Sequence, residues 1–275
     1  RNKRHSLIEI GYRNRKMAVA LTKTVISMNS FIESLVKLFA QTAGKDKLAK
    51  ILQYGAKLFG HMCQQRKKAE WTGIWKKIET SAGGARKVWR LGNTFSEQQK
   101  ILQIIKAGNV FQILNLLALC RQTGMYFYWV FDHLVWTTSV GVTKLDTAKL
   151  SWYSSVSWFI GLLCSIIIDI QTLNLTIKKE RQLIVALTSA PTPQQEGDSA
   201  IVPVDNTKLK AELTTVQKKK NELYLNCIKN GADSIVAANL LKFYQTSQGT
   251  VGMAGLVSAI IGGYQMWPAA PAPAS

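Results

Sequence analysis

The 275-residue sequence contains few of the residue types that most catalytic and metal sites use. It has only 3 histidines, and they share no metal-ligand spacing with carboxylates or cysteines. Its 4 cysteines are too far apart for a local C-x-x-C motif, which indicates a reduced environment and no small disulfide framework. A phosphate-binding glycine loop and a nucleophile motif are also missing. We therefore expect no cofactor, no metal and no enzymatic activity.

Carboxylates are scarce as well, with 16 Asp and Glu against 35 Lys and Arg, which gives a formal net charge of +19. Such an imbalance favours a polyanionic partner, either nucleic acid or an anionic lipid surface. Residues 1–110 hold 22 Lys and Arg but 6 Asp and Glu, and the last 33 residues carry no charge. The chain is therefore basic in its front half and apolar at its end.

Recognisable targeting signals are lacking too. The sequence shows no pattern of basic, apolar and small-residue regions typical of a signal peptide, so we do not expect secretion. The final "APAS" is neither a peroxisomal-type nor an endoplasmic-reticulum address. Any organelle targeting is expected to be internal.

Two uncharged stretches reach the length of a membrane-spanning helix. The first is Trp152–Ile168, for which we expect a transmembrane helix over 151–170, with a buried core helix as the alternative. The second is Gln248–Trp267, in which small residues recur every fourth position and would let helices approach closely in lipid. We expect a glycine-rich transmembrane helix over 248–267, with a packing and oligomerisation face of Gly252, Gly255, Ala259 and Gly263.

The rest of the chain divides around these spans. We expect a basic amphipathic-helical region over 1–121 and an aromatic segment over 122–150 that lies at the membrane interface or packs in a bundle. Asp132 and His133 at the centre of that segment oppose a free-standing span. Residues 171–247 are expected to form helices around a low-complexity break at 191–206, with Gly231 interrupting the second helix. An uncharged tail covers 268–275. The fold class is all-α.

One stretch of the front half, "DKLAKILQYGAKLFG" at 46–60, has apolar residues at helical spacing beside lysines. Gly44 and Asp46 suggest a helix stop near Ala43 followed by an N-cap. The apolar face could lie against the protein itself, in a partner groove or at the headgroup boundary of a bilayer. The two apolar spans elsewhere raise the lipid alternative to about equal weight with the packed helix.

Tryptophans lie next to basic residues in "WTGIWKKI" at 71–78 and "ARKVWRLG" at 85–92. This combination occurs at membrane interfaces and at single-stranded nucleic-acid sites. The sequence has no recognisable nucleic-acid-binding motif, and apolar spans are unusual in such proteins. We therefore expect no nucleic-acid partner.

Four segments in this order resemble the peroxin eleven family of peroxisomal membrane proteins: "GKDKLAKILQYGAKL" (44–58), "ARKVWRLGNTF" (85–95), "YFYWVFDHLVW" (126–136) and "GTVGMAGLVSAIIGGYQMWP" (249–268). The resemblance covers nearly the whole chain, apart from the basic N-terminal extension and the break at 191–206. It implies an integral protein of the peroxisomal or glycosomal membrane with amphipathic surface helices. It also implies membrane elongation before organelle division, self-association, and recruitment of a tail-anchored fission adaptor and a dynamin-related GTPase.

The residues and the resemblance together predict a lipid-binding amphipathic helix. Its apolar face would be wedged into one leaflet, and its lysines would contact anionic phospholipid headgroups. The residues assigned to it are Lys47, Leu48, Lys50, Ile51, Leu52, Lys57, Leu58 and Phe59. The positive charge of the front half places the N-terminal region in the cytosol.

The alternative function is a channel for small metabolites across the peroxisomal membrane. An ionisable pair inside an aromatic segment could line a polar path, and Asp132 and His133 are the residues that would do so. An interfacial helix whose polar residues face water or another helix is the simpler interpretation of the same pair.

Overall fold

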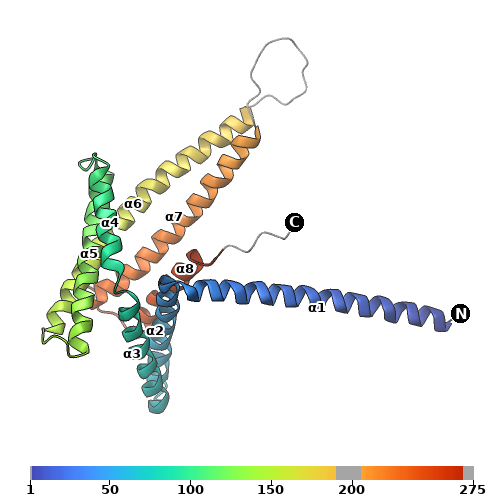
Figure 1. Ribbon diagram of the computed structural model, residues 1–275, viewed down its shortest axis with the longest axis horizontal. Helices are drawn as coiled ribbons and strands as arrows, with labels where there is room; N and C mark the ends of the chain where they lie inside the picture. The colour runs from blue at the N-terminus through green and yellow to red at the C-terminus, as the bar shows by residue number, and fades with distance from the viewer. Residues whose placement is uncertain (1, 190–205, 269–275) are drawn as a thin grey trace, which may run out of the picture. The chain divides into compact units, whose positions relative to one another are not determined.

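The computed structural model describes residues 2–189 and 206–268, with side chains from residue 16 onward except 18–20 and 23 (Figure 1). Its described ranges contain eight helices and no strand, which confirms the all-α prediction. The helices are α1 (Asn2–Ala40), α2 (Thr42–Gln65), α3 (Ala69–Trp89), α4 (Asn93–Lys106), α5 (Ile113–Ser139), α6 (Thr147–Ser189), α7 (Asn206–Leu240) and α8 (Gln248–Gln265). The predicted break at 191–206 lies outside the described residues except for its last position, as does the tail beyond Pro268.

The chain forms two compact units. The first contains residues 1–45 and 266–275 and is dominated by α1. The rings of Phe31 and Trp267 stack in it, with centroids 5.5 Å apart. Gly44 is required at the corner after α1, because a Cβ atom there would run into the carbonyl oxygen of Leu38. The helix ends at Ala40 and the next begins at Thr42, so the stop comes three residues earlier than predicted and Asp46 is not an N-cap.

The second unit, residues 46–265, holds the remaining helices. α2 and α3 form a hairpin, and α2 ends in a left-handed turn at Lys67, with φ 56° and the Lys68 amide donating to the Cys63 carbonyl. α5 packs against α4 and α6, α6 runs beside α7, and α7 contacts α8 (Figure 1). A small apolar core joins α2, α7 and α8 through Tyr54, Val236, Val251 and Ala254.

Two predicted elements have different bounds in the structure. α6 continues to Ser189, far beyond the predicted 151–170, and α7 passes through Gly231 without interruption. A Cβ at position 231 would meet nothing within 4 Å, so this glycine is not required by a close contact. Its cost in a helix, about 1 kcal/mol relative to alanine, is too small to break a 35-residue element.

α6 is the one helix in the described ranges that is long and apolar enough to cross a membrane, and few residues of its most apolar part are buried. At 43 residues it measures about 65 Å, roughly twice the thickness of a hydrocarbon core. Its last third carries ion pairs to α7, Lys179 with Glu212 and Glu180 with Lys220. The apolar first half is therefore the part that suits lipid.

The second predicted span does not meet the same criteria. α8 has 18 residues, and glycines lower its apolar character. Eight of its residues are buried, and its small side chains contact α2 at Tyr54 and Leu58. The prediction of about two transmembrane helices is therefore corrected to one candidate span, with α8 forming part of the helix bundle.

Candidate functional site

The α2–α3 hairpin holds several ion pairs between its two helices. The Arg86 guanidinium donates to Asp46 at 3.0 Å and to the Gln53 side-chain oxygen at 2.7 Å. Nearer the tip, Lys57 and Glu79 form an ion pair at 2.7 Å. These pairs join the two helices along their length.

Lys50 lies deeper, where α2 meets α7 and α8. Its ammonium donates to both carboxylate oxygens of Asp233, at 2.7 and 3.0 Å, and to the Ser258 hydroxyl at 2.8 Å. Only 6% of Lys50 is exposed. Burial lowers its pKa to about 8, although the charge of Asp233 works in the opposite direction. This residue therefore tethers three helices through a single buried ammonium group.

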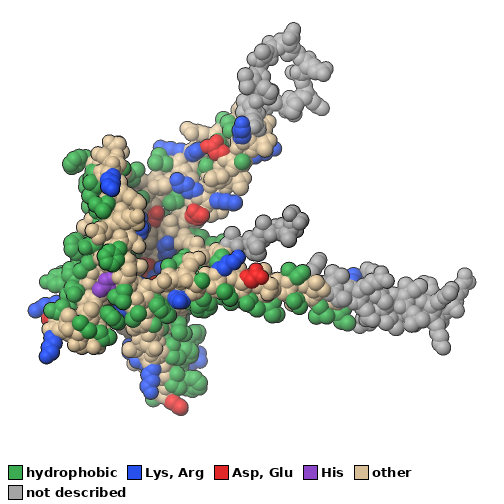
Figure 2. Space-filling model, in the orientation of Figure 1, with side chains coloured by type: hydrophobic (Ala, Val, Ile, Leu, Met, Phe, Trp, Pro, Cys, Tyr) green, Lys and Arg blue, Asp and Glu red, His purple; other side chains and the backbone are tan. Residues whose placement is uncertain are grey.

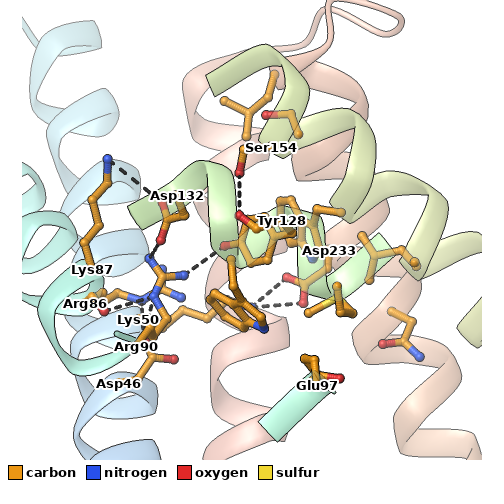
Figure 3. Close-up of a pocket in the computed structure, with 18 of the residues that line it drawn as sticks. Asp46, Lys50, Arg86, Lys87, Arg90, Glu97, Tyr128, Asp132, Ser154 and Asp233 are labelled. Carbon is orange, nitrogen blue, oxygen red and sulfur yellow. Dashed lines mark hydrogen bonds and ion pairs between the residues drawn. The ribbon is translucent and has the colours of Figure 1, made fainter. Parts of the chain in front are cut away.

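Arg90 occupies the centre of a second group of charges (Figure 3). Its guanidinium lies 3.1 Å from Asp132, 3.5 Å from Asp46 and 5.2 Å from the centroid of the Trp129 ring, and it donates to the Tyr128 hydroxyl at 2.9 Å. Burial alone would raise the pKa of Asp46, but the charges of Arg86 and Arg90 outweigh it and hold the pKa below its usual range.

Asp132 and His133, the predicted polar-path residues, have different surroundings. Asp132 faces Arg90 and, at 4.0 Å, Lys87. His133 contacts the Arg90 carbonyl at 3.0 Å and the Thr94 hydroxyl at 3.2 Å, so it connects α5 to the start of α4. Asp132 lines the cavity described next, whereas His133 does not.

A cavity of about 540 Å³ lies among α2, α3, α4, α5, α6 and α7. We call it the charged cavity because seven cationic and four anionic side chains line it. The cations are Lys47, Lys50, Arg86, Lys87, Arg90, Arg121 and Lys229, and the anions are Asp46, Glu97, Asp132 and Asp233. Several of these side chains point toward one another in Figure 3, whereas Glu97 stands apart from the rest.

The outer side of the hairpin carries an apolar face, which we define as Leu52, Phe59, Trp75, Ile78 and Trp89. Leu52 is 52% and Phe59 46% exposed, and the Phe59 and Trp75 rings lie 5.3 Å apart. Leu52, Ile78 and Trp89 also line a groove of about 470 Å³ between α2 and α3. Hydrophobic side chains follow the hairpin in Figure 2. The hairpin thus has ion pairs between its helices and an apolar face on its outer side, and further basic residues are exposed at its tip and on α3.

The predicted wedge residues are divided by this geometry. Leu52 and Phe59 belong to the apolar face and Leu48 is half-buried, whereas Ile51 and Leu58 lie beside Gly263 and Gly252 of α8.

The predicted headgroup lysines are placed differently from expectation. Lys50 is buried, Lys57 pairs with Glu79, and the stem of Lys47 lies against Gly262. Exposed basic residues occur instead at the hairpin tip and on α3, at Arg66, Lys67, Lys68, Lys76 and Lys77.

The predicted small-residue face of α8 lies against α2 within the same chain. An added Cβ at Gly252 would come within 2.7 Å of the Leu58 amide nitrogen, and one at Gly255 would run into the Tyr54 ring. Ala259 is fully buried and Gly263 lies beside Ile51. Close approach of α8 to α2 therefore depends on these small residues, while Met253, Ile260 and Tyr264 are exposed on α8.

Sequence reasoning did not find the buried charges. Arg86, Arg90 and Asp233 each form an ion pair in one of the two charge groups. The sequence pattern pointed only to the two arginines, within "ARKVWRLG", and indicated a membrane interface instead of a buried site. The available signal was Arg86 and Arg90, four residues apart on the same face as Ala82, opposite the exposed Val88.

Comparison with known proteins now assigns the class. The model of the family "Peroxisomal biogenesis factor 11 (PEX11)" matches residues 32–267. The chain belongs to this family. This confirms the resemblance on which the sequence-based expectations were founded.

Its relatives come from distant lineages. The Peroxisomal membrane protein 11 homolog of Dictyostelium discoideum is 56% identical over 256 residues, covering 92% of this chain and 100% of its own. Peroxisomal membrane protein 11A of Rattus norvegicus is 26% identical, covering 84% and 94%. Peroxisomal membrane protein PMP30B of Candida boidinii is 24% identical, covering 88% and 96%. No solved structure matches the chain.

Proposed function

We propose that this protein remodels the peroxisomal membrane, elongating it through the α2–α3 hairpin and so promoting division and proliferation of the organelle. The observation that carries the proposal is the polarity of the hairpin, with ion pairs inside and Leu52 and Phe59 about half exposed outside. Water would penalise this arrangement, whereas the boundary of a bilayer would cover the apolar face. Family membership supports a peroxisomal membrane as the surface involved.

Insertion of the apolar face of the hairpin into lipid would contribute a substantial free energy of membrane binding. Fully burying a large apolar side chain contributes about 1.5–3 kcal/mol, so a half-exposed Leu52 or Phe59 contributes about 1 kcal/mol on entering lipid. Trp75, Ile78 and Trp89 add smaller amounts, because they are already half-buried. The whole face provides a few kcal/mol, enough for reversible binding that many copies strengthen together.

Headgroup attraction in this proposal comes from exposed cations. Arg66, Lys67 and Lys68 form the hairpin tip, and Lys76 and Lys77 follow on α3. Each contributes about 1 kcal/mol at an anionic surface. Anionic phospholipids are therefore the proposed lipid partners, and the buried Lys50 serves the fold instead.

Membrane curvature would follow from insertion of the hairpin into one leaflet only. A hairpin lying in one leaflet expands that leaflet relative to the other, and the imbalance favours bending. The first half of α6 would hold each copy in the membrane. Because the small-residue face of α8 is occupied by α2, self-association would use other surfaces, such as the exposed Met253, Ile260 and Tyr264.

The resemblance extends this proposal to further partners and to topology. The front half of the chain would face the cytosol, where it would recruit a tail-anchored fission adaptor and a dynamin-related GTPase. Protease protection of intact organelles that carry a tag before α1 tests the orientation, because a tag protected from protease would contradict it.

The experiment that tests remodelling uses the full chain reconstituted with liposomes. Leu52→Glu removes an apolar contact and places a charge at the membrane, so we expect membrane binding of the hairpin to fall on the order of 100-fold and tubulation to disappear. Leu145→Glu is the matched control, because Leu145 is 46% exposed in the α5–α6 connection. Equal tubulation by both variants, or equal activity on neutral and anionic lipid, would contradict the proposal.

A metabolite channel is the second candidate. The observation in its favour is that Asp132 lines the charged cavity. Conductance across planar bilayers that Asp132→Asn abolishes and Leu52→Glu leaves intact would support a channel. Absence of conductance from a tubulating preparation would exclude it.

A further inference from the structure

The charged cavity has more positive charge than its own carboxylates neutralise. Its seven cations exceed its four anions by three, although it lies inside the second unit. Arg121 is exposed and Lys47 and Lys229 are half-buried, so these three cations face the cavity without being shut off from solvent. Like charges gathered on one concave surface repel one another and attract an anion.

The surplus cations can be identified. Asp46 forms ion pairs with Arg86 and Arg90, Asp132 pairs with Arg90, and Asp233 pairs with Lys50. Arg121 of α5 and Lys229 of α7 have no carboxylate within ion-pair distance in the part of the chain that the structure describes, and Lys47 is 3.9 Å from Asp46.

Lys229 shows how closely the surplus charges gather. Its ammonium donates to the neutral side chains of Asn226 and Gln265, at 2.9 and 2.7 Å. Burial lowers the pKa of Lys229, and the charges of Lys47 and Arg121 contribute to the lowering, while the carboxylates of Asp169 and Asp233 act in the opposite direction. Three cations from α2, α5 and α7 therefore repel one another at the cavity wall.

An independent observation comes from unsatisfied polar atoms. Among the described residues, two buried side-chain atoms have neither a hydrogen-bond partner nor an ion-pair partner: Glu97 Oε2 and Trp129 Nε1. Both residues line the charged cavity. Glu97 is only 8% exposed, and its other carboxylate oxygen accepts from Lys100 at 2.8 Å. An occupant that both donates and accepts hydrogen bonds would satisfy these atoms.

We infer that the charged cavity binds a phosphate group that carries hydroxyl groups, as in a polyol phosphate or the headgroup of a phospholipid. The phosphate lies against Arg121, Lys229 and Lys47, which match its negative charge. A hydroxyl group donates to the free Glu97 carboxylate oxygen, and an oxygen accepts from the Trp129 indole. At about 540 Å³ the cavity falls within the usual size of small-molecule sites.

The site is separate from the apolar face of the hairpin, so it does not depend on the remodelling proposal. It also differs from a channel lining, because a channel has to release its solute, whereas three cations without matching carboxylates would hold an anion in place. Binding would offset the repulsion among the three surplus cations and stabilise the folded chain.

The test measures thermal stability and binding of the detergent-purified full chain. One arm adds glycerol 3-phosphate or inositol 1-phosphate, with inorganic phosphate and uncharged inositol for comparison. The other arm uses nanodiscs of phosphatidylcholine with or without phosphatidylinositol. Saturable stabilisation in the first arm identifies a free polyol phosphate, and stabilisation in the second arm alone identifies a lipid headgroup.

The decisive variant is Arg121→Gln/Lys229→Gln, for which we expect binding to weaken about 100-fold because two charge-assisted contacts are lost. Without added phosphate, this variant should unfold at a higher temperature than the wild type, since the repulsion is relieved. Lys144→Gln/Lys149→Gln changes the charge equally at two exposed positions and should bind as the wild type does. Saturable binding in neither arm, or equal weakening by both double variants, would overturn the inference.

Discussion

Removing the carboxylate of Asp233 should destabilise the folded chain more than most single changes. The variant Asp233→Ala leaves the Lys50 ammonium 6% exposed, with one hydroxyl partner and no countercharge. Breaking a buried pair from one side costs about 3–5 kcal/mol. A large share of the stability of a typical domain would be lost, so we expect a clear fall in the unfolding midpoint.

The assay is unfolding of the full chain in mild detergent, followed by tryptophan fluorescence. Asp233→Asn is the conservative control, because it keeps the shape and one hydrogen-bond acceptor but removes the charge. The double variant Lys50→Met/Asp233→Leu removes both charges and should recover most of the loss. If the losses of stability in Lys50→Met and in Asp233→Leu simply add up in the double variant, the pairing of Lys50 with Asp233 is refuted.

Two further predictions concern the same bundle. Burial lowers the pKa of Lys50 to about 8, so between about pH 8 and the ordinary lysine value near 10.4 the folded chain binds fewer protons than the unfolded chain. The stability of the wild type should therefore rise with pH across that window relative to Lys50→Met, as unfolding midpoints measured at each pH would show; a parallel response would contradict it. Gly255→Leu should cost about 1–3 kcal/mol, because its side chain meets the Tyr54 ring, whereas Gly231→Ala in open space should stabilise α7 by up to about 1 kcal/mol. Thermal unfolding measures both, and equal midpoints would argue against the packing of α8 on α2.

Helical periodicity predicted the all-α fold because it depends only on neighbours along the chain. The segment from Leu48 to Phe59 is helical, as its spacing indicates, and the apolar run from Trp152 lies within α6. Family resemblance could also be recognised from segments in order. These features need no knowledge of which helices meet.

Which face of a helix points inward could not be predicted in the same way. Lys50 resembles a solvent-facing lysine on a helical wheel, but its partner Asp233 lies 183 positions away. Amphipathicity identifies two faces without saying which one meets protein. The charged interior therefore reversed the expected role of Lys50.

The same limit explains α8. Uncharged composition and small residues at every fourth position suit a membrane span and also suit close packing inside a bundle. Contacts from Gly252 and Gly255 to α2 show where that face lies in this chain. Only the tertiary partner distinguishes the two alternatives.

The central claim is that the apolar face of the α2–α3 hairpin enters lipid, and the depth of its side chains tests it most directly. A cysteine-free full chain would carry a single environment-sensitive label at position 52, 59 or 212 in liposomes containing lipids with quenchers along their acyl chains. We predict strong quenching at 52 and 59 and none at 212, which replaces the exposed Glu212 on α7. Quenching at 52 and 59 as weak as at 212 would contradict the account.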